Sequence, residues 1–291
     1  MRHSRLAGTK WWLMSSAIAI AAILGSTGAR PAAQQTAASK KVRWNKIIAR
    51  LEQGQTARSG EVAKFIDMEH GAFSMDRLET ILAELAKDKD ATGHPRLTPY
   101  IRIPHDASED IGWAIYQVLD AGVLAIMLPH VETKADALKA VRAMRYPPQR
   151  GWSNEKYPEP RGLRGPTPNR AGKYWGEENP VEYAKRADVW PLNPEGELFL
   201  VAQIETADGV KNIKDILQVP GLGAILLSPS DMSFSLGVAP ARLPFVAGQL
   251  PPEVEAAYET VLTACDAQKT VICGAALAGE RIMKRHNVRF F

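Results

Sequence analysis

The chain has 291 residues, 45% of them hydrophobic and 23% charged, proportions that are ordinary for a globular protein and argue against intrinsic disorder. This length allows two domains or one α/β barrel, and it can bury a large core without disulfide bonds. The formal net charge is +4, and the first 29 residues hold Arg2, Arg5 and Lys10 but no acidic residue. The remainder is nearly neutral, so the charge does not indicate nucleic-acid binding.

The N-terminus has the pattern of an export signal. A basic segment is followed by an apolar stretch from Trp11 to Leu24 and then by small residues, so we expect a signal peptide over 1–29. The stretch is short for a membrane span, and an uncleaved anchor is the second interpretation. Residues 30–43 have the composition of a linker. We therefore expect an exported protein, periplasmic or secreted.

Helical and strand-like segments alternate along the rest of the chain. Helices are predicted over 45–52, 75–87, 108–119 (with Ser108 as its N-cap), 133–145, 208–218, 252–268 and 279–286. Strands are predicted over 64–69, 97–103, 123–129, 198–204, 223–228 and 270–276. Because the strands are almost wholly apolar, they indicate a parallel sheet covered by helices. A single TIM-type (β/α)8 barrel over 44–291 is the favoured fold, and an open doubly wound sheet is the alternative.

Residues 146–197 interrupt this alternation with a segment rich in proline, glycine, arginine and aromatic residues. A loop of this length in a compact fold is usually a lid, a binding loop or an interface. Its arginines are interpreted as a solvated face; they are Arg150, Arg161, Arg164 and Arg170.

The chain has two cysteines, Cys265 on a predicted helix and Cys273 on the strand that follows. They could pair in an oxidising compartment. Their spacing alone says nothing about geometry, and we favour two buried thiols.

Polar residues follow several of the predicted strands, where the active site of a parallel barrel lies. These residues are Asp67, Glu69, His70, Arg102, His105, His130, Gln203, Glu205, Ser228, Ser230 and Asp231. Glu205 and Asp231 end neighbouring strands about 4.8 Å apart, so their carboxylates can converge on one ion. Two carboxylates without a thiolate suit a hard cation such as Mg²⁺ or Mn²⁺. The alternative is that each carboxylate caps the helix that follows it.

Asp67 and His70 lie close together at a strand end. A carboxylate bonded to an imidazole suits a general base, and the alternative is a histidine satisfied within a loop. Arg102 ends an apolar strand, where a guanidinium needs either a substrate carboxylate or an ion pair with Asp67 or Glu69. The segment 228–231 indicates a helix N-terminus, whose free N–H groups can hold a carboxylate.

Taken together, these segments resemble the HpcH/HpaI aldolase family, metal-dependent aldolases related to citrate lyase β subunits. The matching strings are FIDMEHG (65–71), YIRIP (100–104), AIMLPHVET (125–133) with AVRAMRYPPQRG (140–151), VAQIET (201–206) and SPSDMS (228–233). Each string is short, but they occur in the order of the family.

The resemblance implies a TIM-type barrel that uses Mg²⁺ or another divalent ion, with Mn²⁺ and Co²⁺ as further candidates. It implies an aldolase that joins pyruvate, or a similar 2-oxo acid, to an aldehyde, and a homo-oligomer. The metal ligands would be Glu205 and Asp231. The catalytic residues would be His70, Asp67 and Arg102, with Asp67 orienting His70 and Arg102 binding the 2-oxo acid. Substrate contacts would also come from Gln203, Ser230 and Asp231.

The chain departs from the family pattern in two places. Only QTARSGEVA (55–63) separates the leading helix from the first matching strand, which is too short for the usual strand and helix, so the first barrel strand is missing or replaced. The chain also stops at VRFF, where the family continues. Two other functions therefore stay open: a citrate-lyase or malyl-CoA type of lyase, and a catalytically impaired barrel that binds a small carboxylate.

Overall fold

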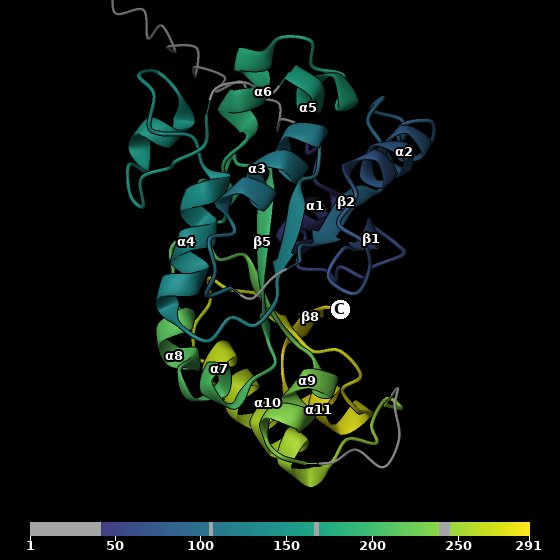
Figure 1. Ribbon diagram of the computed structural model, residues 1–291, viewed down its shortest axis with the longest axis vertical. Coiled ribbons are helices and arrows are strands. Elements are labelled where there is room, and N and C mark those ends of the chain that lie inside the picture. The colour runs from purple at the N-terminus through teal and green to yellow at the C-terminus, as the bar shows by residue number, and fades with distance from the viewer. Residues whose placement is uncertain (1–41, 105–106, 166–168, 239–244) are drawn as a thin grey trace, which may run out of the picture. The chain divides into compact units, whose positions relative to one another are not determined.

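The computed structural model describes residues 42–104, 107–165, 169–238 and 245–291 (Figure 1). The predicted signal peptide, most of the predicted linker and His105 lie outside these residues. The end of the predicted linker belongs to the fold, because Arg43 pairs with Glu52 and donates to the carbonyl of Gly196 at 2.8 Å. Within the described ranges, no helix combines the length and the apolar character that crossing a bilayer requires.

Eight strands and eleven α-helices follow one another along the described chain. The strands are β1 (Ala63–Asp67), β2 (Thr98–Arg102), β3 (Ala125–Leu128), β4 (Val189–Trp190), β5 (Leu198–Ile204), β6 (Ala224–Leu227), β7 (Cys273–Gly274) and β8 (Val288–Phe290). The helices are α1 (Lys46–Glu52), α2 (Met75–Leu85), α3 (Gly112–Ala121), α4 (Lys134–Met144), α5 (Asn169–Tyr174), α6 (Pro180–Arg186), α7 (Ala207–Lys211), α8 (Ile213–Ile216), α9 (Pro229–Ser235), α10 (Pro252–Asp266) and α11 (Glu280–Arg285). A 3₁₀ turn covers Ser153–Lys156.

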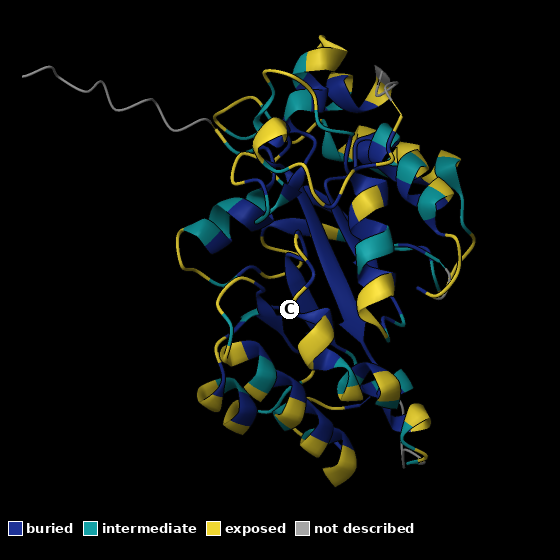
Figure 2. Ribbon diagram, turned by 90° about the vertical axis from the view of Figure 1, so that its left-hand side faces the viewer, coloured by how far each residue is buried: buried dark blue, intermediate teal, exposed yellow. Residues whose placement is uncertain are grey.

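The strands pair in parallel, which confirms the predicted α/β class. The order is β1–β2–β3–β5, with β4 pairing along the first residues of β5 and β6 along its last ones. Backbone bridges from Ala224 to Ile272 and from Leu227 to Ala275 continue the array to β7, which pairs with β8. Strand β5 is buried along its whole length, as the dark blue arrows in Figure 2 illustrate.

The segment between α1 and β1 contributes isolated bridges rather than a strand, and one of them joins Ser59 to Ala63 of β1. Ala57 pairs with Phe290 of β8, and its N–H donates to the carbonyl of Arg289 at 2.8 Å. Over the described residues, no ladder joins this segment or β8 to β1. The parallel pairs therefore run from β1 around to Ala57 without a closing ladder, as the short connection of the sequence leads one to expect.

Helix α1 closes the interior between the strands at their amino ends. Its residues Ile47, Ile48 and Leu51 are buried in one cluster with the rings of Phe199 and Phe290. The helix begins at its N-cap Asn45, whose side chain accepts hydrogen bonds from the first helical N–H groups and donates to carbonyls that precede β3 and β5. The opposite, carboxyl ends of the strands stay open for polar side chains.

Two local predictions were wrong. Helix α3 begins at Gly112 instead of Ser108, because residues 107–110 form a turn in which the Asp110 carboxylate accepts from the Gly112 N–H at 3.3 Å. The helix predicted over 208–218 is divided at Asn212 into α7 and α8. The segment predicted as a loop over 146–197 contains the 3₁₀ turn Ser153–Lys156, helices α5 and α6 and strand β4.

The two cysteines form a disulfide, which corrects the expectation of free thiols. Cys265 lies in the last turn of α10 and Cys273 begins β7, with Cα atoms 5.9 Å apart. The connecting turn is held by the Gln268 side chain, which accepts from the N–H groups of Thr270 and Val271. This turn brings two sulfur atoms together that are eight residues apart in the sequence.

Candidate active site

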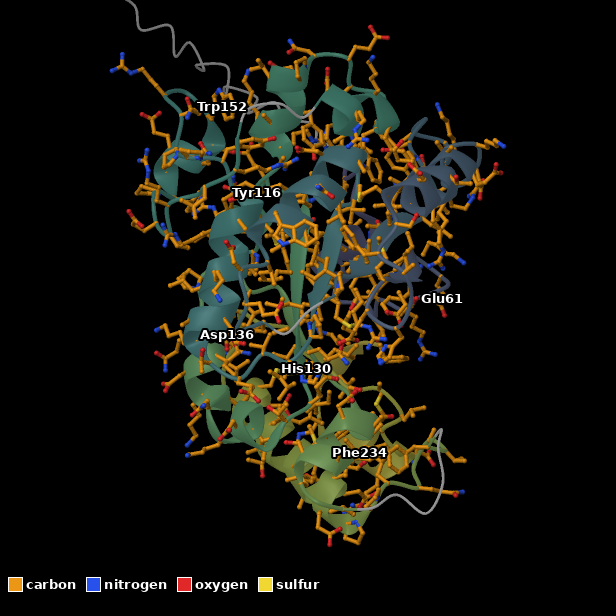
Figure 3. The ribbon with its side chains drawn as sticks, in the orientation of Figure 1. Glu61, Tyr116, His130, Asp136, Trp152 and Phe234 are labelled. Carbon is orange, nitrogen blue, oxygen red and sulfur yellow. A yellow bond between two sulfur atoms is a disulfide. The ribbon has the colours of Figure 1, made fainter. Side chains whose placement is uncertain are left out.

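Five strands bring polar side chains to the same edge of the sheet. Strands β1, β2, β3, β5 and β6 are parallel, so their carboxyl ends lie together. Figure 3 labels His130, which follows β3 at this edge. The predicted strand-end residues that the structure describes can therefore be placed relative to one another.

Arg102 is paired with two protein carboxylates. The register sets it opposite Asp67 on β1, and its Nε donates to Asp67 Oδ1 at 3.1 Å while Nη2 contacts Oδ2. Its Nη1 lies 2.8 Å from Glu69 Oε2. The ion pair that the sequence left open is therefore present. Binding of a substrate carboxylate by Arg102 stays a prediction.

Asp67 organises the turn after β1 as well as Arg102. Its Oδ1 accepts from the backbone N–H groups of Glu69 at 3.0 Å and His70 at 3.4 Å. Burial alone would raise the pKa of Asp67, but the hydrogen bond and charge of Arg102, together with these N–H groups, lower it to about 2. Asp67 is therefore an ionised anchor for the turn that carries His70.

His70 projects from this turn and is 64% exposed. Its Nδ1 lies 2.6 Å from Arg102 Nη2, 3.4 Å from Glu69 Oε2 and 3.5 Å from Asp67 Oδ2. Because a guanidinium can only donate, a neutral His70 accepts at Nδ1 and carries its proton on Nε2. The predicted contact with Asp67 is thus longer than the contact with Arg102.

Glu205 is the most deeply buried carboxylate of the site, with 1% exposure directly after β5. Its Oε1 accepts from the His130 N–H at 3.0 Å, and its Oε2 accepts from the Gln203 side-chain amide. Burial raises the pKa of Glu205 to about 7; His130 partly offsets this, and the charges of Asp231 and Glu69 add to it. Helix α7 is capped by Thr206, so the alternative that Glu205 is its cap is wrong.

Asp231 lies in the first turn of α9, which follows β6 directly. Since β5 and β6 pair up to Ile204 and Leu227, Glu205 and Ser228 continue from adjacent strand ends. The negative charge of Asp231 contributes to the raised pKa of Glu205, so the two carboxylates interact electrostatically. Ser230 precedes Asp231, and its carbonyl accepts from the Ser233 hydroxyl at 2.7 Å.

Glu69 and His130 belong to this cluster, although the sequence offered Glu69 only as an alternative ion-pair partner of Arg102 and gave His130 no specific role. One His130 ring nitrogen, Nε2, lies 3.9 Å from both Glu69 Oε1 and Glu205 Oε1. The three side chains offer ligand atoms that all lie within 4.8 Å of one another. Burial raises the pKa of Glu69, although Arg102, His70 and His130 oppose the rise. Their position after β1 and β3 was the signal that could have identified them.

These residues fit a hard divalent cation. In the part of the chain that the structure describes, no lysine or arginine forms an ion pair with Glu205 or Asp231. A buried carboxylate without a cationic partner is costly, and the carboxylate oxygens of Glu205, Asp231 and Glu69 are the ligand type that suits Mg²⁺ or Mn²⁺. Gln203 Oε1 is likewise buried without a hydrogen-bond partner among the described residues. Both observations indicate that the site is built to receive a charged ligand.

The active sites of parallel α/β enzymes lie at the carboxyl ends of the strands, where this chain places acidic groups, an arginine and histidines. The model of the HpcH/HpaI aldolase/citrate lyase family matches residues 54–284, and the chain belongs to this family. Aldolases of this family generally use a divalent metal ion.

The chain spans only about 54–60% of the length of the two relatives compared below. The chain is 35% identical to a 4-hydroxy-2-oxovalerate aldolase of Novosphingobium aromaticivorans over 60% of this chain and 54% of that protein. It is 28% identical to a hydroxypyruvate/pyruvate aldolase of Paraburkholderia phytofirmans over 62% of this chain and 60% of that protein. The crystal structure of an HpcH/HpaI aldolase/citrate lyase family protein from Burkholderia cenocepacia superposes with a TM-score of 0.56 at 27% identity, covering 78% of this chain and 76% of that one.

Proposed function

We propose that this chain is a metal-dependent aldolase of the class II type. It would cleave or form the carbon–carbon bond of a 4-hydroxy-2-oxo acid, with pyruvate or a similar 2-oxo acid as the enolate partner and an aldehyde as the other. The observation that carries the proposal is the buried Glu205, which has Asp231 and Glu69 nearby and no lysine or arginine partner among the described residues. The activities of the related aldolases support the substrate class.

Glu205 and Asp231 are the proposed metal ligands, with Glu69 and His130 as neighbouring donors. A divalent ion, Mg²⁺ or Mn²⁺ and alternatively Co²⁺, would supply positive charge where negative charge develops on the carbonyl oxygen of the 2-oxo acid. Arg102 lies beside this cluster, and the negative charge of Glu205 helps to raise the pKa of Arg102. It would hold the substrate carboxylate or the developing enolate oxygen, and Gln203 Oε1 and Ser230 would complete the substrate contacts.

His70 is the proposed proton carrier at the 4-hydroxyl oxygen. In the arrangement observed, Nδ1 accepts from Arg102. To protonate an oxygen that gains negative charge during bond formation, His70 must be the imidazolium, in which Nδ1–H faces Glu69 or Asp67 and Nε2 gives up its proton, leaving neutral imidazole. Bond cleavage needs Nε2 without its proton. A rotation that lets Nδ1–H donate to Asp67 or Glu69, now 3.5 and 3.4 Å away, provides this form. Asp67 thereby orients the imidazole in one direction of the reaction.

The direct test follows pyruvate release from a panel of 4-hydroxy-2-oxo acids by the purified protein with Mg²⁺, Mn²⁺ or Co²⁺. We expect turnover that requires one of these ions and is abolished by EDTA. Turnover that survives EDTA contradicts the metal-dependent mechanism. A citrate-lyase or malyl-CoA type of lyase is tested on the same barrel with citrate and malyl-CoA as substrates.

A second candidate is a barrel that binds a small carboxylate without turnover. It is favoured by the ion pairs that already occupy Arg102 and by the replaced first strand. Saturable pyruvate binding with no cleavage under any metal would support this candidate over the aldolase.

We also propose that the protein is exported, with cleavage after Ala29, and forms a homo-oligomer. The apolar stretch after Lys10 and the disulfide between Cys265 and Cys273 support export, because disulfides persist in oxidising compartments. The intact mass of the protein recovered from cell fractions tests the cleavage site. Sedimentation equilibrium tests the oligomer.

A further inference from the structure

A cavity of about 470 Å³ lies at the edge of the sheet opposite the candidate active site. Its wall is formed by the end of α10, the connection from α10 into β7, and the connection from α11 into β8. Strand β7 continues the array in parallel beside β6, and the cavity lies at its first residue, Cys273. Glu205 and Asp231 instead follow the carboxyl ends of β5 and β6. The cavity is therefore separate from the proposed metal site.

The wall of this cavity is positively charged. Three cationic side chains line it: Lys269, Arg285 and Arg289. Among the described residues that line it, Asp266 is the only carboxylate, and both of its oxygens are already engaged. Its Oδ2 lies 2.7 Å from His286 Nδ1, and its Oδ1 accepts from the Asn287 N–H at 3.2 Å. The excess of positive charge favours an anion as the ligand.

Arg289 is the cation of this wall with the fewest partners. It lies in β8 and is half-buried. Its Nε is covered, and its Nη1 approaches only the Leu51 carbonyl, at 3.5 Å. Its Nη2 is not covered and donates to no described atom, so it is available to an acceptor in the cavity. A half-buried guanidinium without an anionic partner is costly, and an anion that binds beside it offsets this cost.

The other two cations are open to solvent. Lys269 is exposed and forms no ion pair with a described residue. Arg285 is 57% exposed and pairs with Glu259 through Nη1 at 3.0 Å, so its Nε and Nη2 keep no partner in the described chain. An ammonium group and two guanidinium groups from separate segments thus line one cavity. This combination suits a phosphate group, because arginine offers paired N–H donors and lysine a compact charge.

The rest of the wall has room for more than an ion. Val271, Ile272 and the disulfide give it an apolar part. The cavity volume lies within the range of about 300–1,000 Å³ that is usual for small-molecule sites. A free phosphate ion leaves much of this space empty. A phosphate group carried on a small organic body fits both the charged and the apolar part.

The turn that carries Lys269 is ordered before any ligand binds. The Gln268 side chain accepts from the N–H groups of Thr270 and Val271 at 2.7 and 2.9 Å. Its amide donates to the carbonyls of Cys265 and Val271 at 2.9 and 3.0 Å, and the disulfide joins the two ends of the turn. A preformed site spends little binding energy on ordering the protein.

We propose that this cavity binds a small molecule through a phosphate group. The phosphate oxygens accept hydrogen bonds from Lys269 and Arg289, with Arg285 at the rim, and the organic part lies against Val271 and Ile272. The inference goes beyond the proposed aldolase function and does not depend on it.

The test uses glycerol 3-phosphate as the probe, with calorimetric titration of the purified protein at constant ionic strength and without added metal. We expect saturable binding in the micromolar to millimolar range, and binding of acetate at least about tenfold weaker. Inorganic phosphate should bind more weakly than the ester. Equal binding of the two would assign the cavity to free phosphate and overturn the role of the organic part. No saturable binding of either at about 10 mM, or equal binding of acetate, overturns the proposal.

Variants of exposed lysines locate the binding on this cavity. Lys269→Gln should weaken binding of glycerol 3-phosphate about threefold or more, and Lys269→Glu about tenfold or more, without disturbing the core. Lys284→Gln is the matched control, because Lys284 is 74% exposed, pairs with Glu280 and does not line the cavity. Binding at Arg102 of the candidate active site would be insensitive to all three variants. Equal affinity in Lys269→Gln, Lys269→Glu and Lys284→Gln therefore overturns the assignment to this cavity.

Discussion

The two ends of the parallel strands differ in how completely their buried charges are paired with other groups. At the amino end, Arg145 is 1% exposed and all three of its guanidinium nitrogens have close acceptors: Asp188 Oδ1 at 2.6 Å and the carbonyls of Pro160 and Tyr157 at 2.6 and 2.7 Å. At the carboxyl end, Glu205 is equally buried, but its hydrogen bonds come from a backbone N–H and an amide, and its pKa is raised to about 7.

This difference separates the framework from the site. A buried charge with a complete set of partners stabilises one arrangement of the chain and binds nothing further. A buried carboxylate without a cation is costly by itself and gains free energy when a cation binds. Arg164 lies at the amino end with the framework charges, but its set of partners is incomplete, as that of Glu205 is. Two of its nitrogens have no hydrogen-bond partner in the described part of the chain.

The largest effect is expected from removing a framework charge. Arg145→Met leaves Asp188 buried without its cation and should lower the free energy of unfolding by about 3–5 kcal/mol. Arg150→Met, at an exposed position nearby, should change it by less than about 0.5 kcal/mol. Urea unfolding followed by circular dichroism measures both. If the two variants unfold alike, the framework role of Arg145 is wrong.

The next effect belongs to the site. Glu205→Gln keeps the shape of the side chain and removes its charge, so metal-dependent turnover should fall by about 100-fold, or about 2.7 kcal/mol. Stability without metal should not fall, because no buried charge loses a partner, and stabilisation by Mg²⁺ or Mn²⁺ should disappear. The exposed neighbour Asp208→Asn serves as the control in both assays. A Glu205→Gln protein that still gains thermal stability from the ion refutes the proposed ligand.

The disulfide at the start of β7 is a covalent contribution to the stability of the amino end. Replacing Cys265 and Cys273 together by serine opens a loop of eight residues and should lower the free energy of unfolding by about 2–3 kcal/mol. Dithiothreitol should destabilise the unmodified protein by a similar amount and leave the double variant unaffected. Identical unfolding curves for oxidised and reduced protein are incompatible with the disulfide.

The smallest effect comes from a partly exposed ion pair of the framework. Lys46 Nζ lies 2.6 Å from Asp90 Oδ2; partial burial would raise the pKa of Asp90, but the bonds to Lys46 and Thr92 lower it strongly. A lowered carboxyl pKa contributes stability that is complete above the unfolded pKa of about 4 and is lost progressively as the pH falls from there toward the lower folded pKa. Asp90→Asn should therefore cost about 1 kcal/mol or less at pH 7 and less than that at pH 3. Thermal unfolding at pH 7 and pH 3 checks this, with the exposed Asp208→Asn as the control. An equal loss at both pH values contradicts it.

Apolar strands were the features that the sequence determined best. The prediction over 198–204 has the same bounds as β5, because a short, almost wholly apolar run is typical of a parallel strand buried on both faces. Parallel strands run in the same direction, so their carboxyl ends lie at one edge of the sheet. For this reason the sequence also predicted which polar residues lie at that edge, namely Asp67, Arg102, Glu205 and Asp231. Whether Glu205 and Asp231 share an ion stays a prediction.

Only the tertiary structure decided which charged groups are compensated. Arg164, interpreted from the sequence as solvated, is buried, and Cys265 faces Cys273 across a turn. Arg102 pairs with Asp67 and Glu69 instead of standing free. The physical reason is that periodicity along a chain reports local burial, whereas the partner of a charge is set by segments far apart in sequence that packing brings within a few ångströms.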